Sequence, residues 1–311
     1  MKDVLCVGNA VADTKARPVD SLPATGTLAL VDSVSLHGGG CALNTALALS
    51  RFGMKAGIVT GVGQDAFGEF LLGLLKRAGV DTSPAVTDPV LQSSATAVMV
   101  NRRGERSFLH TIGASAAITE RAVPDSLLRR YRALHLSGFY ILPRLDGAPA
   151  MRVLRRALKL GLVTSLDTCW DPRRRWHLVR MCLPYTDYYM PSYEEAREAF
   201  GSRDPRAIAE AALKVGVRRG VILKTGAKGC FALFRGGAQV RVPAFRVKVV
   251  DTTGAGDCFD AGFLAGLLRG RALSEALRLG CAAGACSVSG MGSQGTIRSY
   301  RQIAGMTGRR R

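Results

Sequence analysis

The feature that most constrains the fold of this sequence is the alternation of short apolar, β-branched runs with longer segments of helical period. Residues 4–7 and 56–60 have the character of strands, whereas residues 44–52 and 67–78 carry apolar side chains at helical spacing. Such alternation predicts an α/β fold in which helices cover a mainly parallel sheet. The same rhythm predicts strands at residues 133–136, 163–167 and 221–224, helices at 148–160, 194–200, 256–268 and 273–288, and a hairpin at 231–234 and 239–242.

Two segments, at about residues 10–36 and 90–114, interrupt this rhythm with strand-like alternation and no helix between the strands. The second segment contains a predicted hairpin formed by residues 96–100 and 106–110. We expect these strands to form a small β-sheet that projects over a cleft as a lid. No shift in composition marks a second domain, so residues 1–311 are predicted to form a single domain.

Composition indicates the cellular compartment of such a chain. No stretch approaches the ~20 apolar residues that a membrane span requires, and the apolar run at residues 4–7 is too short for a signal peptide. We therefore expect a soluble, cytoplasmic protein. The eight cysteines include no Cys-x-x-Cys pair, and the four histidines have no ligand spacing, which favours free thiols over a zinc site.

The net charge of +19 is the extreme of the composition, and it raises the question of nucleic-acid binding. The basic residues lie in short scattered groups such as Arg102-Arg103, Arg218-Arg219 and Arg309 to Arg311. No basic stripe interleaved with aromatic residues and no nucleic-acid-binding motif accompanies them. We expect no nucleic-acid partner and no membrane partner, while the charge suits anionic nucleotides or phosphorylated substrates.

The strongest motif is the nonapeptide that runs from Asp251 to Phe259, Asp-Thr-Thr-Gly-Ala-Gly-Asp-Cys-Phe. It follows a β-rich stretch with Val247, Val249 and Val250 and leads into a predicted helix. Small residues at a helix N-terminus let backbone N–H groups converge on an anion. The backbone of Gly254, Ala255 and Gly256 is therefore predicted to bind a phosphoryl group during its transfer.

Asp257 follows this anion-binding backbone directly. We expect its carboxylate to act as the base that accepts the proton of a substrate hydroxyl. The helix N-terminus should stabilise the carboxylate and make it a weak base, so it orients the hydroxyl first and takes the proton late. The alternative is a glycine-rich turn in which the aspartate only caps the helix.

The complete nonapeptide resembles the C-terminal signature of the ribokinase-like (PfkB) carbohydrate kinases. The likeness covers nearly the whole chain, because residues 38–44 and 61–68 resemble the two N-terminal motifs of that family. The resemblance implies a three-layer ribokinase-like fold with a small β-sheet lid. It also implies an ATP-dependent kinase that uses Mg²⁺ and acts on a hydroxyl of a sugar or sugar-like molecule.

Residues 61–68 also allow a second interpretation, because Gly-x-Gly-x-x-Ala after a strand resembles a dinucleotide-binding fingerprint. That segment lies in the second strand–helix unit, and no acidic residue ends a clear strand ~20 positions later, as the fingerprint requires. No Gly-x-x-x-x-Gly-Lys-Ser/Thr sequence occurs, which excludes a P-loop enzyme.

The resemblance assigns substrate binding to a set of N-terminal residues. A carboxylate after the first strand can accept hydrogen bonds from two neighbouring sugar hydroxyls. Each assignment has a structural alternative: Asp13 could lie in a surface loop, Asn44 could cap a helix, and Arg106 could be solvated. The predicted substrate residues are Asp13, Gly39, Gly40, Asn44 and, on the lid hairpin, Arg106.

Two further segments resemble the family's nucleotide site. Ser192 and Glu195 occupy the Asn and Glu positions of its Asn-x-x-Glu element, and Glu195 is expected to organise Mg²⁺ through water. The loop with Lys224, Thr225, Gly226 and Gly229 is expected to wrap the nucleotide, with an ordinary strand-to-hairpin turn as the alternative. Cys281 stands where some relatives place Asn near the adenine.

The same resemblance implies a monovalent cation, such as K⁺, at Asp251 and the carbonyl of Thr253, near backbone oxygens of the segment 287–292. Several functions remain open. A nucleoside kinase and a sugar-phosphate kinase are the alternatives among enzymes, and a catalytically silent sugar- or nucleotide-binding regulator is the alternative outside them. Exposed lid strands also favour a lid-mediated homodimer.

Overall fold

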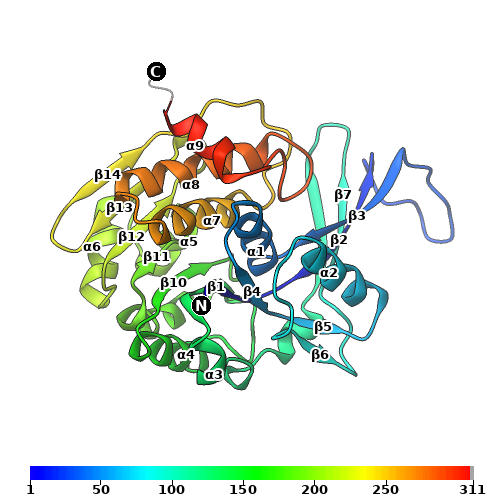
Figure 1. Ribbon diagram of the computed structural model, residues 1–311. Coiled ribbons are helices and arrows are strands. Elements are labelled where there is room, and N and C mark those ends of the chain that lie inside the picture. The colour runs from blue at the N-terminus through cyan, green and yellow to red at the C-terminus, as the bar shows by residue number, and fades with distance from the viewer. Residues whose placement is uncertain (309–311) are drawn as a thin grey trace.

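The computed structural model describes residues 1–308 and centres on an eight-stranded sheet with helices on both faces (Figure 1). Neighbouring strands from β4 to β12 are parallel, whereas β13 and β14 add an antiparallel hairpin at one edge. In their order across the sheet, the strands are β14 (Gln239–Val242), β13 (Cys230–Phe234), β12 (Gly220–Lys224), β11 (Tyr188–Tyr189), β10 (Val163–Thr168), β9 (Tyr131–Phe139), β1 (Lys2–Val7) and β4 (Ala56–Val59).

Both faces of the central sheet are buried, so successive residues of a central strand enter two different cores rather than core and solvent. In β1, Val4 and Cys6 enter one hydrophobic core, while Leu5 and Val7 enter the other. The first core packs under α1 (Cys41–Arg51), α2 (Ala66–Arg77), α7 (Ala255–Leu268), α8 (Leu273–Val288) and α9 (Tyr300–Gly308). The second packs under α3 (Asp125–Leu128), α4 (Ala148–Lys159), α5 (Tyr193–Phe200) and α6 (Pro205–Val215).

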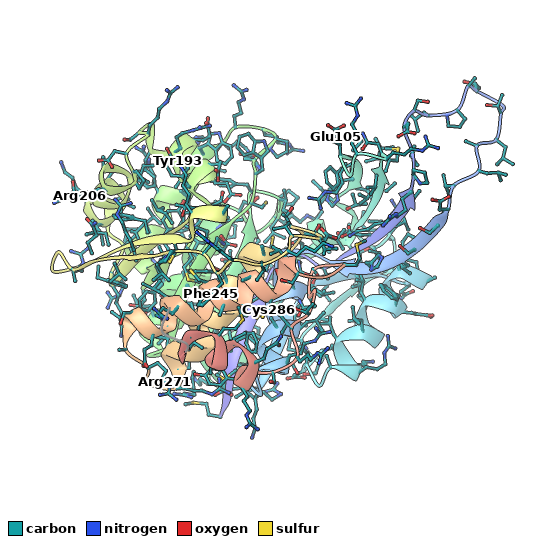
Figure 2. The ribbon with its side chains drawn as sticks, turned by 90° about the horizontal axis from the view of Figure 1, so that it is seen from above. Glu105, Tyr193, Arg206, Phe245, Arg271 and Cys286 are labelled. Atoms are coloured by element: carbon teal, nitrogen blue, oxygen red, sulfur yellow. The ribbon has the colours of Figure 1, made fainter. Side chains whose placement is uncertain are left out.

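A second sheet of four strands projects from one side of this body (Figures 1 and 2). In their order across this small sheet, the strands are β3 (Ser33–Gly39), β2 (Val11–Arg17), β7 (Ala95–Val100) and β8 (Arg106–Thr111). β7 and β8 form the hairpin that the sequence predicts. A further short pair, β5 (Gly61–Gly63) and β6 (Val86–Asp88), lies nearby, and 3-10 helices lie at Gly113–Ala117, Glu120–Ala122, Trp176–Met181, Leu183–Tyr185 and Gly226–Lys228.

The register of the small sheet separates its two faces. Lys15 pairs with Val98, which in turn pairs with Phe108, so these three side chains share one face with Asp13. Lys15 and Val98 are buried, at 5% and 3% exposure. Val34, on the other face, is 71% exposed. We call the face that carries Asp13 and Lys15 the inner face, because it is turned toward the body of the protein.

The stretch around Val247, Val249 and Val250 differs from the expected β structure. It forms no strand, and the three side chains are 36%, 60% and 47% exposed. β-branched residues favour strands only where a neighbouring strand offers a surface to pack on, and here the chain crosses the protein surface alone. Among residues 1–308, no helix combines the length and apolarity that crossing a membrane demands.

Candidate active site

The nonapeptide lies at the N-terminus of α7. Gly254 has φ +76°, and a Cβ atom there would lie 2.7 Å from the Cβ of Ser293, so the turn into the helix requires glycine. Helix α7 begins at Ala255, and the N–H groups of its first turn have no partner within the helix. The predicted anion-binding backbone at Gly254, Ala255 and Gly256 is thus at a helix N-terminus.

Asp257 lies in the first turn of α7 and is 8% exposed. Asn44 of α1 donates a hydrogen bond from Nδ2 to Oδ2 of Asp257, at 2.8 Å. Gln294 supports this pair by donating from Nε2 to the carbonyl of Asn44, at 3.0 Å. Gly40 occupies the N-cap of α1, so Asn44 is not the helix cap considered as its alternative. Two residues 213 positions apart therefore meet beside the anion-binding backbone.

The pKa of Asp257 moves opposite to our expectation. Burial and, after it, the negative charge of Asp167 raise the pKa of Asp257 to about 6, against the opposing effect of the Asn44 hydrogen bond. The helix N-terminus predicts a weaker base, but loss of solvent and a like charge outweigh it here. The structure therefore makes Asp257 a stronger base than the sequence suggests.

Lys224, at the end of β12, lies directly against the anion-binding backbone. A Cβ atom at Gly256 would be 3.2 Å from the Lys224 Nζ. The ammonium group contacts Asp167 Oδ1 at 2.8 Å and Asp260 Oδ2 at 3.1 Å. Burial alone would lower the pKa of Lys224, but the two carboxylates raise it above the ordinary lysine value, so the side chain is charged.

The rest of the predicted nucleotide loop follows Lys224. Thr225 precedes the 3-10 turn Gly226–Lys228, and Gly229 has φ +94°. A Cβ atom at Gly229 would lie 1.9 Å from the carbonyl oxygen of Val242, so glycine is required for this turn to approach β14. Cys281 of α8 packs against the same hairpin, with its Sγ 3.7 Å from the Cys230 Sγ.

Ser192 and Glu195 form a capping box at the start of α5. The Ser192 hydroxyl accepts from the Glu195 N–H at 3.3 Å, and Glu195 Oε2 accepts from the Ser192 N–H at 3.2 Å. The same Oε2 accepts from the Thr168 hydroxyl at 2.8 Å. Burial and, after it, the charge of Asp167 raise the pKa of Glu195 to about 7. Glu195 thus belongs to the same buried acidic region as Asp257.

This region, which we call the acidic cluster, is defined by Asp167, Glu195, Asp257 and Asp260 around Lys224. One ammonium group faces four carboxylic groups, and Oδ1 of Asp260 has no hydrogen-bond partner within residues 1–308. Burial, aided by Asp167, raises the pKa of Asp260. The cluster therefore has fewer positive than negative groups, and its carboxylate oxygens are ligands of the kind that Mg²⁺ prefers. In the described chain, no three His, Cys, Asp or Glu side chains form a preformed metal site.

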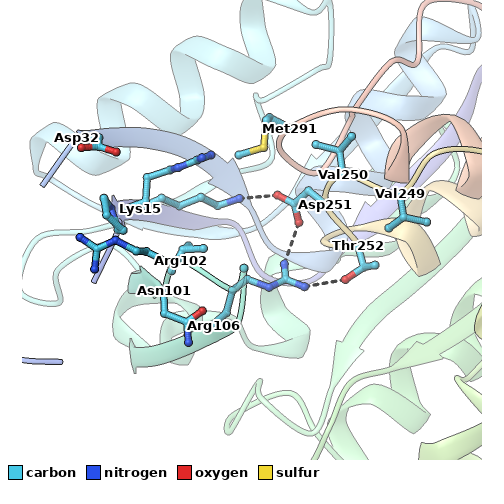
Figure 3. Close-up of a pocket in the computed structure, with 14 residues that line it drawn as sticks. Lys15, Asp32, Asn101, Arg102, Arg106, Val249, Val250, Asp251, Thr252 and Met291 are labelled. Carbon is cyan, nitrogen blue, oxygen red and sulfur yellow. Dashed lines mark hydrogen bonds and ion pairs between the residues drawn. The ribbon is translucent and has the colours of Figure 1, made fainter. Parts of the chain in front are cut away.

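At the other end of the nonapeptide, around Asp251, cations outnumber carboxylates (Figure 3). Asp251 accepts from Lys15 Nζ at 2.8 Å and, through its other oxygen, from a guanidinium nitrogen of Arg106 at 2.8 Å. Arg106 also donates to the hydroxyl groups of Thr252 and Thr253. Burial alone would raise the pKa of Asp251, but these partners, Lys15 foremost, lower it. A monovalent cation at Asp251 would lie beside two positive side chains.

Asp13 lies on the inner face of the small sheet, in β2, and not in a surface loop. A Cβ atom at Gly39 would lie 2.3 Å from the Asp13 Oδ2, so glycine is what allows the carboxylate to lie against β3. Gly40, with φ +93°, follows directly and starts α1. The chain thus brings Asp13, Gly39, Gly40 and Asn44 to one region.

Sequence reasoning missed Lys15, Asp260 and a role for Asp167. Lys15 follows Asp13 by two residues, so strand alternation places both on one face. Asp260 follows Asp257 by three residues, so helical spacing brings it to the same side of α7.

The segment 61–68, which also resembles a dinucleotide-binding fingerprint, has a structural role here. Asp65 accepts hydrogen bonds from the N–H groups of Gly68 and Ser93, both at 2.7 Å. It thereby links α2 to the start of β7.

Comparisons with known proteins identify the family of this chain. The profile of the pfkB family carbohydrate kinases matches residues 1–299. A fructokinase of Rhizobium leguminosarum bv. trifolii is 33% identical over 270 residues, which cover 85% of this chain and 79% of the relative. An uncharacterized sugar kinase of Archaeoglobus fulgidus is 31% identical over 240 residues, covering 75% and 91% of the two chains.

Solved structures show the same fold. A ribokinase of Arabidopsis thaliana, complexed with ribose and ATP, superposes with a TM-score of 0.85 at 22% identity and 99% coverage of both chains. The structure of an E. coli protein in complex with ATP and Mg²⁺ gives a TM-score of 0.84 at 24% identity, and the match covers 100% of both chains. The expected three-layer ribokinase-like fold is confirmed. With its family profile, its relatives and its fold in agreement, the chain belongs to the pfkB family of carbohydrate kinases and is an ATP-dependent sugar kinase.

Proposed function

We propose that this kinase transfers the γ-phosphoryl group of ATP to a hydroxyl of a sugar-like acceptor, with Asp257 as the base. The observation that carries the proposal is the buried Asn44–Asp257 pair beside the helix N-terminus of α7. The backbone at 254–256 stabilises the transferring group, and Asp257 accepts the proton of the attacking hydroxyl. Its pKa of about 6 leaves it ionised at neutral pH.

The acceptor lies between Asp257 and the inner face of the small sheet in this proposal. Asp13 accepts hydrogen bonds from its hydroxyl groups, and Gly39 and Gly40 let the acceptor approach the backbone. The small sheet acts as the lid, and its closure excludes water that would otherwise receive the phosphoryl group.

On the donor side, Lys224 is held between Asp167 and Asp260 with its ammonium against Gly256. There it neutralises phosphate charge that develops beside the anion-binding backbone. Mg²⁺ would supply the positive charge that the acidic cluster lacks, with Glu195 orienting its water ligands. Ser192 and the loop with Thr225, Gly226 and Gly229 enclose the nucleotide, and Cys281 lies toward its base.

The test is an ADP-release assay with ATP, Mg²⁺ and a panel of sugars, sugar acids, sugar phosphates and nucleosides. We expect turnover of at least one acceptor and a loss of about 10³-fold in kcat for Asp257→Asn, within the range for removing a general base. Acceptor binding, measured by calorimetry, should persist. Glu69→Gln, an exposed acidic residue of α2, is the matched control and should retain activity. An active Asp257→Asn enzyme would contradict the assignment.

The panel also separates the alternatives. Relatives of this chain are called fructokinase, ribokinase and 2-dehydro-3-deoxygluconokinase, so neutral sugars and sugar acids are the leading acceptor classes. Phosphorylation of nucleosides or sugar phosphates alone would favour the alternative kinases. Binding without turnover of any acceptor would favour a silent regulator.

A homodimer through the lid forms part of the same proposal. The outer face of the small sheet carries Val34 and Leu109 at 71% and 64% exposure, and an exposed sheet with apolar side chains favours pairing with a second copy. Light scattering at micromolar concentration should give twice the monomer mass. A monomeric mass would refute the dimer.

A further inference from the structure

A cavity of about 590 Å³ lies between the inner face of the small sheet and the chain around Asp251 (Figure 3). More cationic than anionic side chains line it. The charged side chains that line it are the cations Lys15, Arg17, Arg102 and Arg106 and the carboxylates Asp32 and Asp251.

These cations differ in how far their charge is already neutralised. Lys15 and Arg106 share the single carboxylate of Asp251. Arg102 forms an ion pair with Asp20, outside the cavity. Arg17 forms no ion pair or side-chain hydrogen bond with any residue in the 1–308 range that the structure describes. The cavity therefore has excess positive charge and one guanidinium group that no protein group occupies.

Strand β2 connects this cavity to the proposed acceptor site. Asp13, Lys15 and Arg17 alternate along β2 on the same inner face. At about 3.3 Å per residue, Lys15 lies roughly 7 Å and Arg17 roughly 13 Å along the strand from Asp13. Asp13 does not itself line the cavity, so an acceptor whose hydroxyl groups bind Asp13 reaches Arg17 only if it extends along β2 past Lys15.

We propose that the acceptor of this kinase carries an anionic group, a carboxylate or a phosphate, at the end remote from the phosphorylated hydroxyl. Arg17 binds that group, and the shared charges of Lys15 and Arg106 favour its entry. The inference rests on the proposed function, because it uses Asp13 as the anchor of the acceptor. A guanidinium group presents paired N–H donors that match the oxygens of a carboxylate or phosphate.

The experiment compares acceptors that share a six-carbon skeleton and differ in their charged group: neutral hexoses, the corresponding aldonic acids and the corresponding hexose 6-phosphates. We expect kcat/KM for the best anionic acceptor to exceed that for its neutral counterpart at least tenfold. Arg17→Gln should raise KM for the anionic acceptor about tenfold and leave kcat and the KM for ATP unchanged. The preferred anion, carboxylate or phosphate, identifies the chemical class. Arg103→Gln, in the β7–β8 turn next to Arg102 but outside the cavity, is the control.

Several results would overturn the inference: a neutral acceptor preferred, no effect of Arg17→Gln on the anionic acceptor, or a rise in the KM for ATP instead. A second measurement distinguishes failure of the kinase assignment from failure of the anion site. Gluconate and glucose 6-phosphate are titrated calorimetrically into the wild type and Arg17→Gln at fixed ionic strength, without ATP. Binding that weakens in the variant supports the anion site even if no acceptor turns over. Absence of binding of both anions to the wild type refutes it even if a neutral sugar is phosphorylated.

Discussion

The two ends of the nonapeptide from Asp251 to Phe259 differ in charge balance. At its start, the single carboxylate of Asp251 faces the two cations Lys15 and Arg106. At its end, the acidic cluster places four carboxylic groups around the single ammonium of Lys224. The first arrangement has one more positive than negative charge. The second has fewer cations than carboxylic groups and depends on a bound cation or on protonation, which is the basis of the Mg²⁺ site proposed above.

Lys224→Met removes the single cation of the acidic cluster and should lower the free energy of unfolding more than any other substitution proposed for this chain. Removing one member of a buried ion group leaves uncompensated charges and costs about 3–5 kcal/mol. We expect the free energy of unfolding, measured with urea at pH 7.5, to fall by about that amount. Lowering the pH should restore part of it by protonating the carboxylates. Lys228→Met, in the neighbouring turn, is the control, and an unchanged Lys224→Met protein would refute the charge imbalance.

Lys15→Met should have a smaller effect at the other end. Asp251 keeps Arg106 and accepts from the Gly292 N–H at 3.2 Å, so one charged hydrogen bond is lost and its carboxylate stays partnered. The expected fall in the free energy of unfolding is about 1.5–3 kcal/mol, the usual value for such a bond. A loss as large as that of Lys224→Met would remove the contrast between the two ends.

The pH profile tests the acidic end without a mutation. Because the pKa of Asp257 is raised to about 6, the base is protonated below that pH and ionised above it. We expect kcat/KM for a neutral acceptor to fall about tenfold per pH unit below pH 6 and to level off above it. Asp167→Asn removes a charge that raises this pKa and should move the acidic limb to lower pH. A profile that is flat down to pH 4.5 would contradict the assignment.

The smallest expected effect concerns potassium. Since Lys15 and Arg106 already bind Asp251, we expect K⁺ at about 0.1 M, where exposed charges are already screened, to change wild-type activity less than twofold. Lys15→Met removes the ammonium group from Oδ2 of Asp251, which keeps the Gly292 N–H, and should make the enzyme more sensitive to K⁺ than to an equal concentration of tetramethylammonium. Strong stimulation of the wild type would show that a monovalent cation binds despite the two side chains.

Much of the fold was predictable because periodicity is local. Helix α8 spans residues 273–288 as predicted, and the hairpins at 95–111 and 230–242 follow turn signals. Helix α6 was not predicted, although Asp204 at its N-cap and Pro205 after it are a helix-start signal. The stretch at 247–250 was wrongly expected to be β-rich, because a strand needs a partner that propensity alone does not supply.

The site was predictable where a motif keeps its residues together. The position of Lys224 against Gly256 was not, because β12 and α7 meet only through packing of the sheet against the helix. The raised pKa of Asp257 was missed for the same reason. Its cause is burial and the nearness of Asp167, which lies 90 positions earlier in the sequence. Local patterns therefore indicate the chemistry, while tertiary packing sets its charge.

The ties from Asp251 to Lys15 and Arg106 join strands of the small sheet to the loop that precedes the anion-binding backbone. Any movement of that sheet on acceptor binding would therefore also change the conformation of the backbone proposed to bind the nucleotide. Two ligands that favour one conformation strengthen each other's binding by the same factor, whichever binds first. Acceptor and ATP should thus show reciprocal coupling, and the enzyme would hold its phosphoryl donor most tightly when a molecule able to receive the phosphoryl group is already present.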